Sequence, residues 1–521
     1  MDLHNLSNKP VHTIVAIAAG VIGASLVLFF FLGKLVPAAA IVGGTGFALV
    51  LRYSNNPRSL MLWCLILTLP LDLSKRFLLR PHMGGSSAVA IELPDFFLIG
   101  LLFFLVRDFF RGRRVWYIPI PVWTWSVLIG VGCISMALGP FRVLAFLEVF
   151  QKCKLLLLLL VLCNEVCRRE RLEHLIGAML SSVCLQSLIG IAQYVRGQPL
   201  GLQMFGEVSQ GVVDLLSIGT LESGAFVFRI SALLGHANFF AAFVACHLPL
   251  ALALLFAPCK IWLRALALPC LAFGSVALVL TLSRTGWVIA AFCLSWVMLA
   301  SFIHPEMRSR FVFGRVVIVA GAIVMGIAFS GPIMTRIMKS DRGATDVRFE
   351  LLEVAWRMFK DYPVIGSGLN TFVYNMRPYT VYRTRGDFEL NLGKATPVVH
   401  NVYAIYLVEV GIIGLAALLL VSGSIILMGL SNLRSKDGFL FAVGLGGLLG
   451  FVGFLLDWLT SFSLRHAPMS REIFLIIALG CIARYFIRGA SDPYTAKKME
   501  KLEGSRESEK SLVEVVSTSL P

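Results

Sequence analysis

Charge is scarce in this sequence. Only 15% of the 521 residues are charged, compared with about 25% in a typical soluble domain, while 57% are hydrophobic. A soluble fold could not cover its surface with so few charges. The composition therefore excludes a disordered chain, a secreted disulfide scaffold and a cytosolic enzyme with a single membrane anchor, and it indicates an integral membrane protein made of many apolar helices.

Paired cysteines are also lacking. The 11 cysteines are scattered, mostly inside apolar runs, and none form a C-x-x-C motif, so we predict neither a zinc site nor a disulfide framework. The net charge of +16 would suggest a nucleic-acid partner in a soluble protein. In a membrane protein it is better explained by the Lys and Arg that collect in cytoplasmic loops, so we expect membrane lipids and no nucleic acid as partners.

Apolar runs of membrane-spanning length fill most of the chain. Because a spanning helix needs about 20 apolar residues, this length divides the sequence into about fourteen predicted spans. They cover residues 11–32, 35–52, 58–73, 93–107, 118–139, 143–164, 174–195, 230–257, 264–282, 285–303, 315–335, 400–429, 439–460 and 471–487. The predicted fold is an all-α polytopic membrane protein.

Short basic loops orient these spans. Clusters such as those in 107–114, 168–171 and 308–315 fall on one side if every span crosses once, and this side is predicted to be the cytoplasm, together with both termini. The predicted parts of the chain are N-terminal transmembrane helices (1–195), an outer loop (196–229), transmembrane helices with arginine motifs (230–335), a large outer loop (336–399), C-terminal transmembrane helices (400–487) and a disordered cytoplasmic tail (488–521).

The larger outer loop contains an amphipathic stretch, residues 346–360, whose apolar positions recur near helical spacing. We expect it to form a helix that lies against the membrane surface or caps a cavity. Pro363 and the glycine-rich turn at 366–368 end it, and a plain turn is favoured there over a phosphate-binding loop. Elsewhere, Glu148 and Lys152 are four residues apart and are expected to pair on one helix.

Three ionisable residues stand out on the predicted outer side. Arg229 opens the span 230–257, Arg284 lies at the tip of a helical hairpin, and His400 opens the span 400–429. An ionisable residue at the mouth of a span is a functional candidate, because burying it in lipid costs several kcal/mol. Other basic residues on this side could join them: Arg348, Arg377, Arg383 and Arg385 of the larger outer loop, and the histidines His82, His236 and His466.

These side chains suit the binding of a lipid-linked diphosphate. Guanidinium groups bind phosphate oxygens in bidentate fashion, and an imidazole with a near-neutral pKa can accept a proton from an attacking hydroxyl. His236 is a weaker candidate for proton transfer; it follows Arg229 by seven residues and is expected on the same helix face. No DxD-like carboxylate pair lies on this side, so neither a metal ion nor a cofactor is expected.

Each of these residues also has a purely structural interpretation. An interfacial arginine often reaches only to lipid phosphates, and a histidine at a helix end is often a cap or a packed residue. The occurrence of two arginines and a histidine at one membrane face favours the functional interpretation.

The region between Arg348 and Leu415 resembles the signature of the O-antigen ligase/polymerase superfamily. The resemblance rests on Arg348, Trp356, Asp361–Phe372, His400–Tyr403 and Glu409–Leu415. Upstream, Leu282–Gly286 and Arg229–Asn238 are similar to two arginine motifs of that family. The likeness covers residues 225–430, and its motifs do not separate the members of the superfamily.

The resemblance implies a GT-C-like glycosyltransferase of the bacterial inner membrane with a periplasmic active site. Its donor would be a glycan linked to undecaprenyl diphosphate, its acceptor a glycan or lipid A-core, and its reaction inverting and independent of metal. Carried onto this chain, the resemblance makes His400 the general base and Arg229 and Arg284 the diphosphate-binding residues. The predicted substrate-binding residues are Arg348, Asn401, His236, Arg377 and Arg383.

Several alternatives stay open. The family's Gly-Thr-Phe-x-Asn-Pro-Asn motif is replaced here by Ala232–Asn238, which leaves the role of Asn238 undetermined. A ligase would pass a finished glycan to lipid A-core, whereas an exopolysaccharide or O-antigen polymerase would extend another lipid-linked glycan. The alternative of another class is a transporter or lipid flippase, which would tend to carry internal repeats and charges at the bilayer midplane. We find no such repeat in the sequence.

Overall fold

The computed structural model describes residues 56–80, 84–112, 116–208, 228–308, 312–328, 342–379 and 398–489, together with positions 330, 331 and 334. The chain falls into two units, Met1–Cys64 and Leu65–Pro521, and the second contains the site and the groove described below. The predicted spans 11–32 and 35–52 and the tail from residue 490 onward lie outside the described residues.

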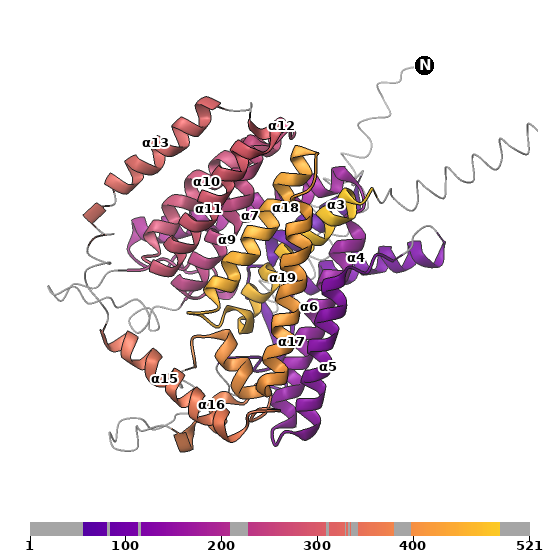
Figure 1. Cartoon of the computed structure of the whole chain (residues 1–521), viewed down its shortest axis with the longest axis vertical. Coiled ribbons are helices and arrows are strands. Elements are labelled where there is room, and N and C mark those ends of the chain that lie inside the picture. Colours follow the sequence, from indigo (N-terminus) through magenta and orange to yellow (C-terminus); the bar gives the residue numbers. More distant parts are fainter. Residues whose placement is uncertain are drawn as a thin grey trace, which may run out of the picture. The chain divides into compact units, whose positions relative to one another are not determined.

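The described residues form fifteen α-helices and one two-stranded sheet (Figure 1). The helices are α3 (Pro57–Thr68), α4 (Leu93–Phe110), α5 (Ile120–Leu138), α6 (Arg142–Glu165), α7 (Arg169–Arg196), α9 (Ala237–Phe256), α10 (Ile261–Leu280), α11 (Arg284–Ile303), α12 (Pro305–Arg308), α13 (Val312–Ala328), α15 (Arg342–Asp361), α16 (Phe372–Asn375), α17 (Val402–Asn432), α18 (Gly438–Asp457) and α19 (Ala467–Ile487). Strands β1 (Ser74–Phe77) and β2 (Val89–Glu92) pair antiparallel.

Seven of these helices are long and apolar enough to cross a membrane: α5, α7, α9, α10, α11, α17 and α18. This confirms the prediction of a polytopic all-α membrane protein, with seven of the fourteen predicted spans supported among the described residues. Helices α4, α6 and α19 also occupy predicted spans, but each carries three or more charged side chains. Helices α3 and α13 are shorter, with 12 and 17 residues.

Helix α9 is the most deeply buried of the spans. Apart from Asn238 and His247, its side chains are apolar or small on every side, and α7, α10, α11 and α18 pack around it. Two glycines of α18 permit the close approach, since a Cβ at Gly446 would lie 2.8 Å from the Cα of Leu250 and a Cβ at Gly450 would lie 2.6 Å from the carbonyl oxygen of Cys246. Small residues at such crossings are typical of helix packing in membranes.

The amphipathic stretch 346–360 is helical, as predicted, and forms most of α15. It packs against α17. The apolar residues of α15 that enter this contact are Leu351, Val354, Ala355 and Met358, which share a buried cluster with Phe372, Val373, Met376, Val398, Val399, Ile405 and Val408. The helix is thus tied to the segment that contains His400.

One predicted helix start is displaced. The span expected from residue 230 begins as α9 only at Ala237, and residues 228–236 are not helical. The prediction that Arg229 and His236 share a helix face is therefore wrong. The apolar run from residue 230 is broken by the positive φ of Ala232 and Gly235, which no α-helix accommodates.

Candidate functional site

The glycine-rich loop after α15 is bound to a break in α17. Ser367 N–H donates to the carbonyl of Val408 (2.9 Å) and Gly368 N–H to that of Glu409 (2.9 Å), while Ile412 N–H donates to the carbonyl of Pro363 (2.9 Å). These amides are used within the protein. The segment 366–368 is consequently a structural junction and not an anion-binding loop, in keeping with the plain-turn interpretation.

Glycine is required on both sides of this junction. Gly411 has φ 70° and interrupts α17, and a Cβ there would lie 2.2 Å from the carbonyl oxygen of Val364. Gly366 has φ 78°, and a Cβ there would lie 2.3 Å from the carbonyl carbon of Glu409. Both positions combine a positive φ with a backbone contact that only glycine permits.

A buried ionic network holds the same loop from inside. The carboxylate of Glu409 accepts the N–H groups of Asn370 (2.8 Å) and Phe372 (3.0 Å) and pairs with Arg465. Arg465 also lies 3.5 Å from Glu148, whose other partner is Lys152. The predicted pairing of Glu148 with Lys152 is confirmed, but it belongs to a network that includes Arg465 and Glu409.

Sequence reasoning missed Arg465 as a site residue. It lies on the short 3-10 helix η5 (Ser463–Arg465) between α18 and α19 and is 7% exposed. The available signal was its position, since it follows the predicted span 439–460 on the outer side and breaks the positive-inside rule as Arg229 and Arg284 do.

Arg229 is positioned by two hydrogen bonds. Its Nε donates to the carbonyl of Thr281 (2.9 Å), and a terminal nitrogen donates to Oδ1 of Asn238 (2.8 Å). The N–H of Asn238 in turn donates to Nδ1 of His236, which caps α9 (3.0 Å). Asn238, whose role the sequence left undetermined, thus orients the Arg229 guanidinium.

Arg284 begins α11 close to this contact. Ser283 caps that helix, and the carbonyl that receives Arg229 belongs to Thr281, three residues before Arg284. The side chain of Arg284 is exposed. The helix start packs tightly on α9, because a Cβ at Gly286 would lie 2.7 Å from the Cβ of Ala241.

His400 lies immediately before α17. Its ring packs edge-to-face on Phe462, with 5.2 Å between ring centroids. Asn401 caps the helix through Oδ1, which accepts the N–H of Ala404 (2.9 Å), while its Nδ2 donates to the carbonyl of Leu459 (3.1 Å). The described contacts of Asn401 therefore give it a structural role.

The segment after α18 connects these stretches. Thr460 Oγ1 donates to Oγ1 of Thr285, next to Arg284 (3.3 Å), and Leu459 accepts from Asn401. Arg229, Arg284 and His400 are up to 171 positions apart. A series of hydrogen bonds joins the turns that carry them: Arg229 to Thr281, Thr460 to Thr285, and Asn401 to Leu459.

The pKa shifts of two histidines indicate which of the predicted site residues lie near one another. Burial, and next the guanidinium of Arg348, lower the pKa of His400 to about 4. Burial, followed by Arg229, His400, His466 and Arg348, lowers the pKa of His236 to about 3. Arg229, Arg348, His236 and His400 therefore share one electrostatic neighbourhood, and both imidazoles are neutral at pH 7.

A third histidine adjoins this cluster. His466 stacks on Phe239 with 4.4 Å between ring centroids, and Phe239 contacts Phe462 and His236. Burial, and next the charge of Arg471, lower the pKa of His466 to about 3.

The other predicted residues are placed differently. Arg377 is an exposed residue of the 3-10 helix η3 (Arg377–Tyr379), and Arg383 lies outside the described residues. Among the described residues, no group of three or more His, Cys, Asp or Glu side chains could hold a metal ion.

Residues 269–419 match the family model described as O-antigen ligase. The matched region contains Arg284, the loop 363–372 and His400, while Arg229 and His236 precede it. No curated protein matches the sequence. With seven described helices that are long and apolar enough to cross a membrane, and with this matched region, the chain is a multi-pass membrane protein that carries an O-antigen ligase domain, which implies a glycosyltransferase of the ligase or polymerase type.

Proposed function

We propose that this protein transfers a glycan from undecaprenyl diphosphate to an acceptor hydroxyl at the periplasmic face of a bacterial inner membrane, with both termini in the cytoplasm. The observation that carries the proposal is the neighbourhood of His400, a mostly buried neutral imidazole beside the Arg348 guanidinium, together with His236, which feels the charges of both His400 and Arg229. A neutral ring can accept a proton, and the adjacent cations suit a diphosphate.

The chemistry is an inverting displacement. The acceptor oxygen attacks the anomeric carbon, the bond from that carbon to the diphosphate oxygen breaks, and His400 takes the hydroxyl proton. Negative charge grows on the departing diphosphate, where guanidinium groups at Arg229 and Arg284 bind it in bidentate fashion. This arrangement supplies the stabilisation that a metal ion provides in other transferases.

The supporting residues divide into two groups. Arg348 supports His400, since after burial its guanidinium is the next cause that lowers the pKa of this imidazole. His236 orients the backbone at the start of α9, and Asn401 caps α17. His236 and Asn401 contribute to substrate binding indirectly, because they stabilise the turns that carry Arg229 and His400. Arg377 and Arg383 are proposed to meet the glycan from the larger outer loop.

The proposal is tested with purified protein reconstituted with lipid-linked glycan and candidate acceptors. His400→Ala is expected to lower transfer by about 10²–10⁴-fold, the usual contribution of a general base, while donor binding is retained. Arg284→Lys should also fail, because a point charge cannot reproduce the guanidinium fork. The matched control is His174→Ala, which changes a partly exposed histidine near the start of α7, on a helix that carries none of the proposed site residues. Full activity in either site variant overturns the proposal.

The product separates ligase from polymerase. A ligase yields a single glycan joined to lipid A-core, whereas a polymerase yields a ladder of longer lipid-linked chains. Transport of the intact lipid without any new glycosidic bond would favour the flippase alternative instead.

A further inference from the structure

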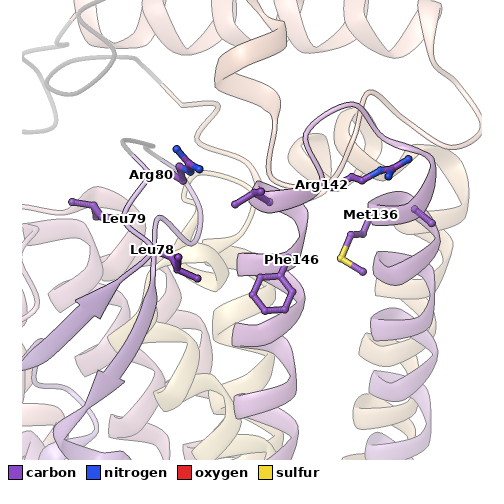
Figure 2. A pocket seen from close by; sticks show the side chains of 8 residues that line it. Leu78, Leu79, Arg80, Met136, Arg142 and Phe146 are labelled. Atoms are coloured by element: carbon purple, nitrogen blue, oxygen red, sulfur yellow. The ribbon is translucent and has the colours of Figure 1, made fainter.

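An apolar groove lies between the β1–β2 connection and the corner that joins α5 to α6. It has a volume of about 910 Å³. Figure 2 shows Leu78, Leu79 and Arg80 on one side and Met136, Arg142 and Phe146 on the other. The groove belongs to none of the stretches that carry Arg229, Arg284 and His400.

The lining combines an apolar floor with two cationic groups. Leu78 is 68% exposed and Phe146 is 43% exposed, so a large hydrocarbon surface is available to a ligand. Arg80 and Arg142 are both exposed, and neither forms an ion pair with a carboxylate among the described residues. Hydrocarbon beside unpaired guanidinium groups complements an amphipathic anion.

Both walls of the groove are fixed to the segments around the candidate site. Asn370 donates through Nδ2 to the carbonyl of Ser86 (2.9 Å) on one wall and to that of Leu144 (2.9 Å) on the other. On the first wall Gly84 lies against Val398, since a Cβ at Gly84 would be 2.5 Å from that side chain. The backbone segments that carry the two arginines are therefore joined to each other through Asn370.

We propose that this groove binds a membrane lipid with a phosphate headgroup. Its hydrocarbon tail lies along Leu78, Met136 and Phe146, and its phosphate lies between the guanidinium groups of Arg80 and Arg142. Guanidinium groups bind phosphate in bidentate fashion. The apolar side chains of the groove offer the hydrocarbon tail a contact surface. This lipid site is separate from the proposed donor site and does not depend on the proposed function.

The test uses the full chain in nanodiscs of phosphatidylcholine that contain a small fraction of photoactivatable phosphatidylglycerol. Cross-linking is expected to map to the groove in the wild-type protein. The double variant Arg80→Gln/Arg142→Gln should lower that cross-linking at least tenfold. Ala137→Trp, which fills the groove and leaves both charges in place, should lower it as well. The matched control is Arg196→Gln, an exposed arginine at the end of α7 that does not line the groove.

The outcomes decide the proposal. Unchanged labelling in the double variant, or an equal loss in Arg196→Gln, overturns it, because the lipid is then only part of the surrounding bilayer. If millimolar glycerol phosphate displaces the photoactivatable lipid as completely as unlabelled phosphatidylglycerol does, the proposal is also overturned, because the site would then bind phosphate without a tail. A folded double variant that loses the groove label and keeps the labels elsewhere supports it.

Discussion

Glu409 holds the glycine-rich loop through two backbone N–H groups and a buried ion pair. Glu409→Gln removes a buried charge that pairs with Arg465 and accepts two backbone N–H groups. Breaking a buried pair by removing one partner typically costs 3–5 kcal/mol, because the other charge is left uncompensated. Arg465 retains Glu148, and glutamine retains one carbonyl acceptor, so we expect about 3 kcal/mol, at the low end of that range.

The assay is equilibrium unfolding in mixed detergent micelles titrated with dodecyl sulfate, followed by circular dichroism. Glu353→Gln is the matched control, since this glutamate pairs with Arg357 on the exposed side of α15. An exposed pair of this kind contributes at most about 0.5 kcal/mol. The comparison holds the chemistry of the substitution constant and varies the burial and the number of partners of the carboxylate.

A double variant tests the assignment to the ion pair. Combining Glu409→Gln with Arg465→Gln should cost at least about 1 kcal/mol less than the sum of the two single changes, because the second change removes the charge that the first left unpaired. The reasoning is refuted if Glu409→Gln unfolds within about 0.5 kcal/mol of the wild type, or if the two changes are additive.

Two further predictions concern the proposed reaction. Because the pKa of His400 is about 4, its imidazole stays neutral as the pH falls through 6.5. We therefore expect kcat/KM to stay level near pH 6.5 and to decline only toward pH 4. A decline of kcat/KM near pH 6.5, in a protein that circular dichroism shows to be folded, would contradict this. Because the same pKa is depressed by folding, the stability that it contributes is present above pH 6.5 and is lost as the pH falls toward 4. Asn238→Ala should weaken donor binding by about 10–100-fold, since a hydrogen bond to a charged group is lost, whereas Asn238→Asp keeps the acceptor and should retain most of it; equal donor affinities in the two variants, measured by titration, would remove Asn238 from the positioning of Arg229.

Much of the architecture follows from local chemistry. The length of an apolar run relative to bilayer thickness is a local property, and it predicted the seven supported spans. The helix at 346–360 was also predictable, because its apolar positions repeat at helical spacing within one element. The predicted spans at α4, α6 and α19 lack full support because these helices carry charged side chains that meet partners elsewhere in the fold, as Lys154 of α6 does with Asp95 of α4 (2.7 Å). A hydropathy profile contains no information about such ion pairs.

The sequence by itself determined that this is a polytopic membrane protein and which basic residues face the predicted outer side. Only the tertiary structure decided how they are held: Arg229 by Asn238 and Thr281, and the glycine loop by Glu409 and Arg465. Turn geometry at Ala232 and Gly235 and contacts between residues dozens or hundreds of positions apart depend on how whole helices pack. No periodicity or motif within a single stretch encodes those contacts.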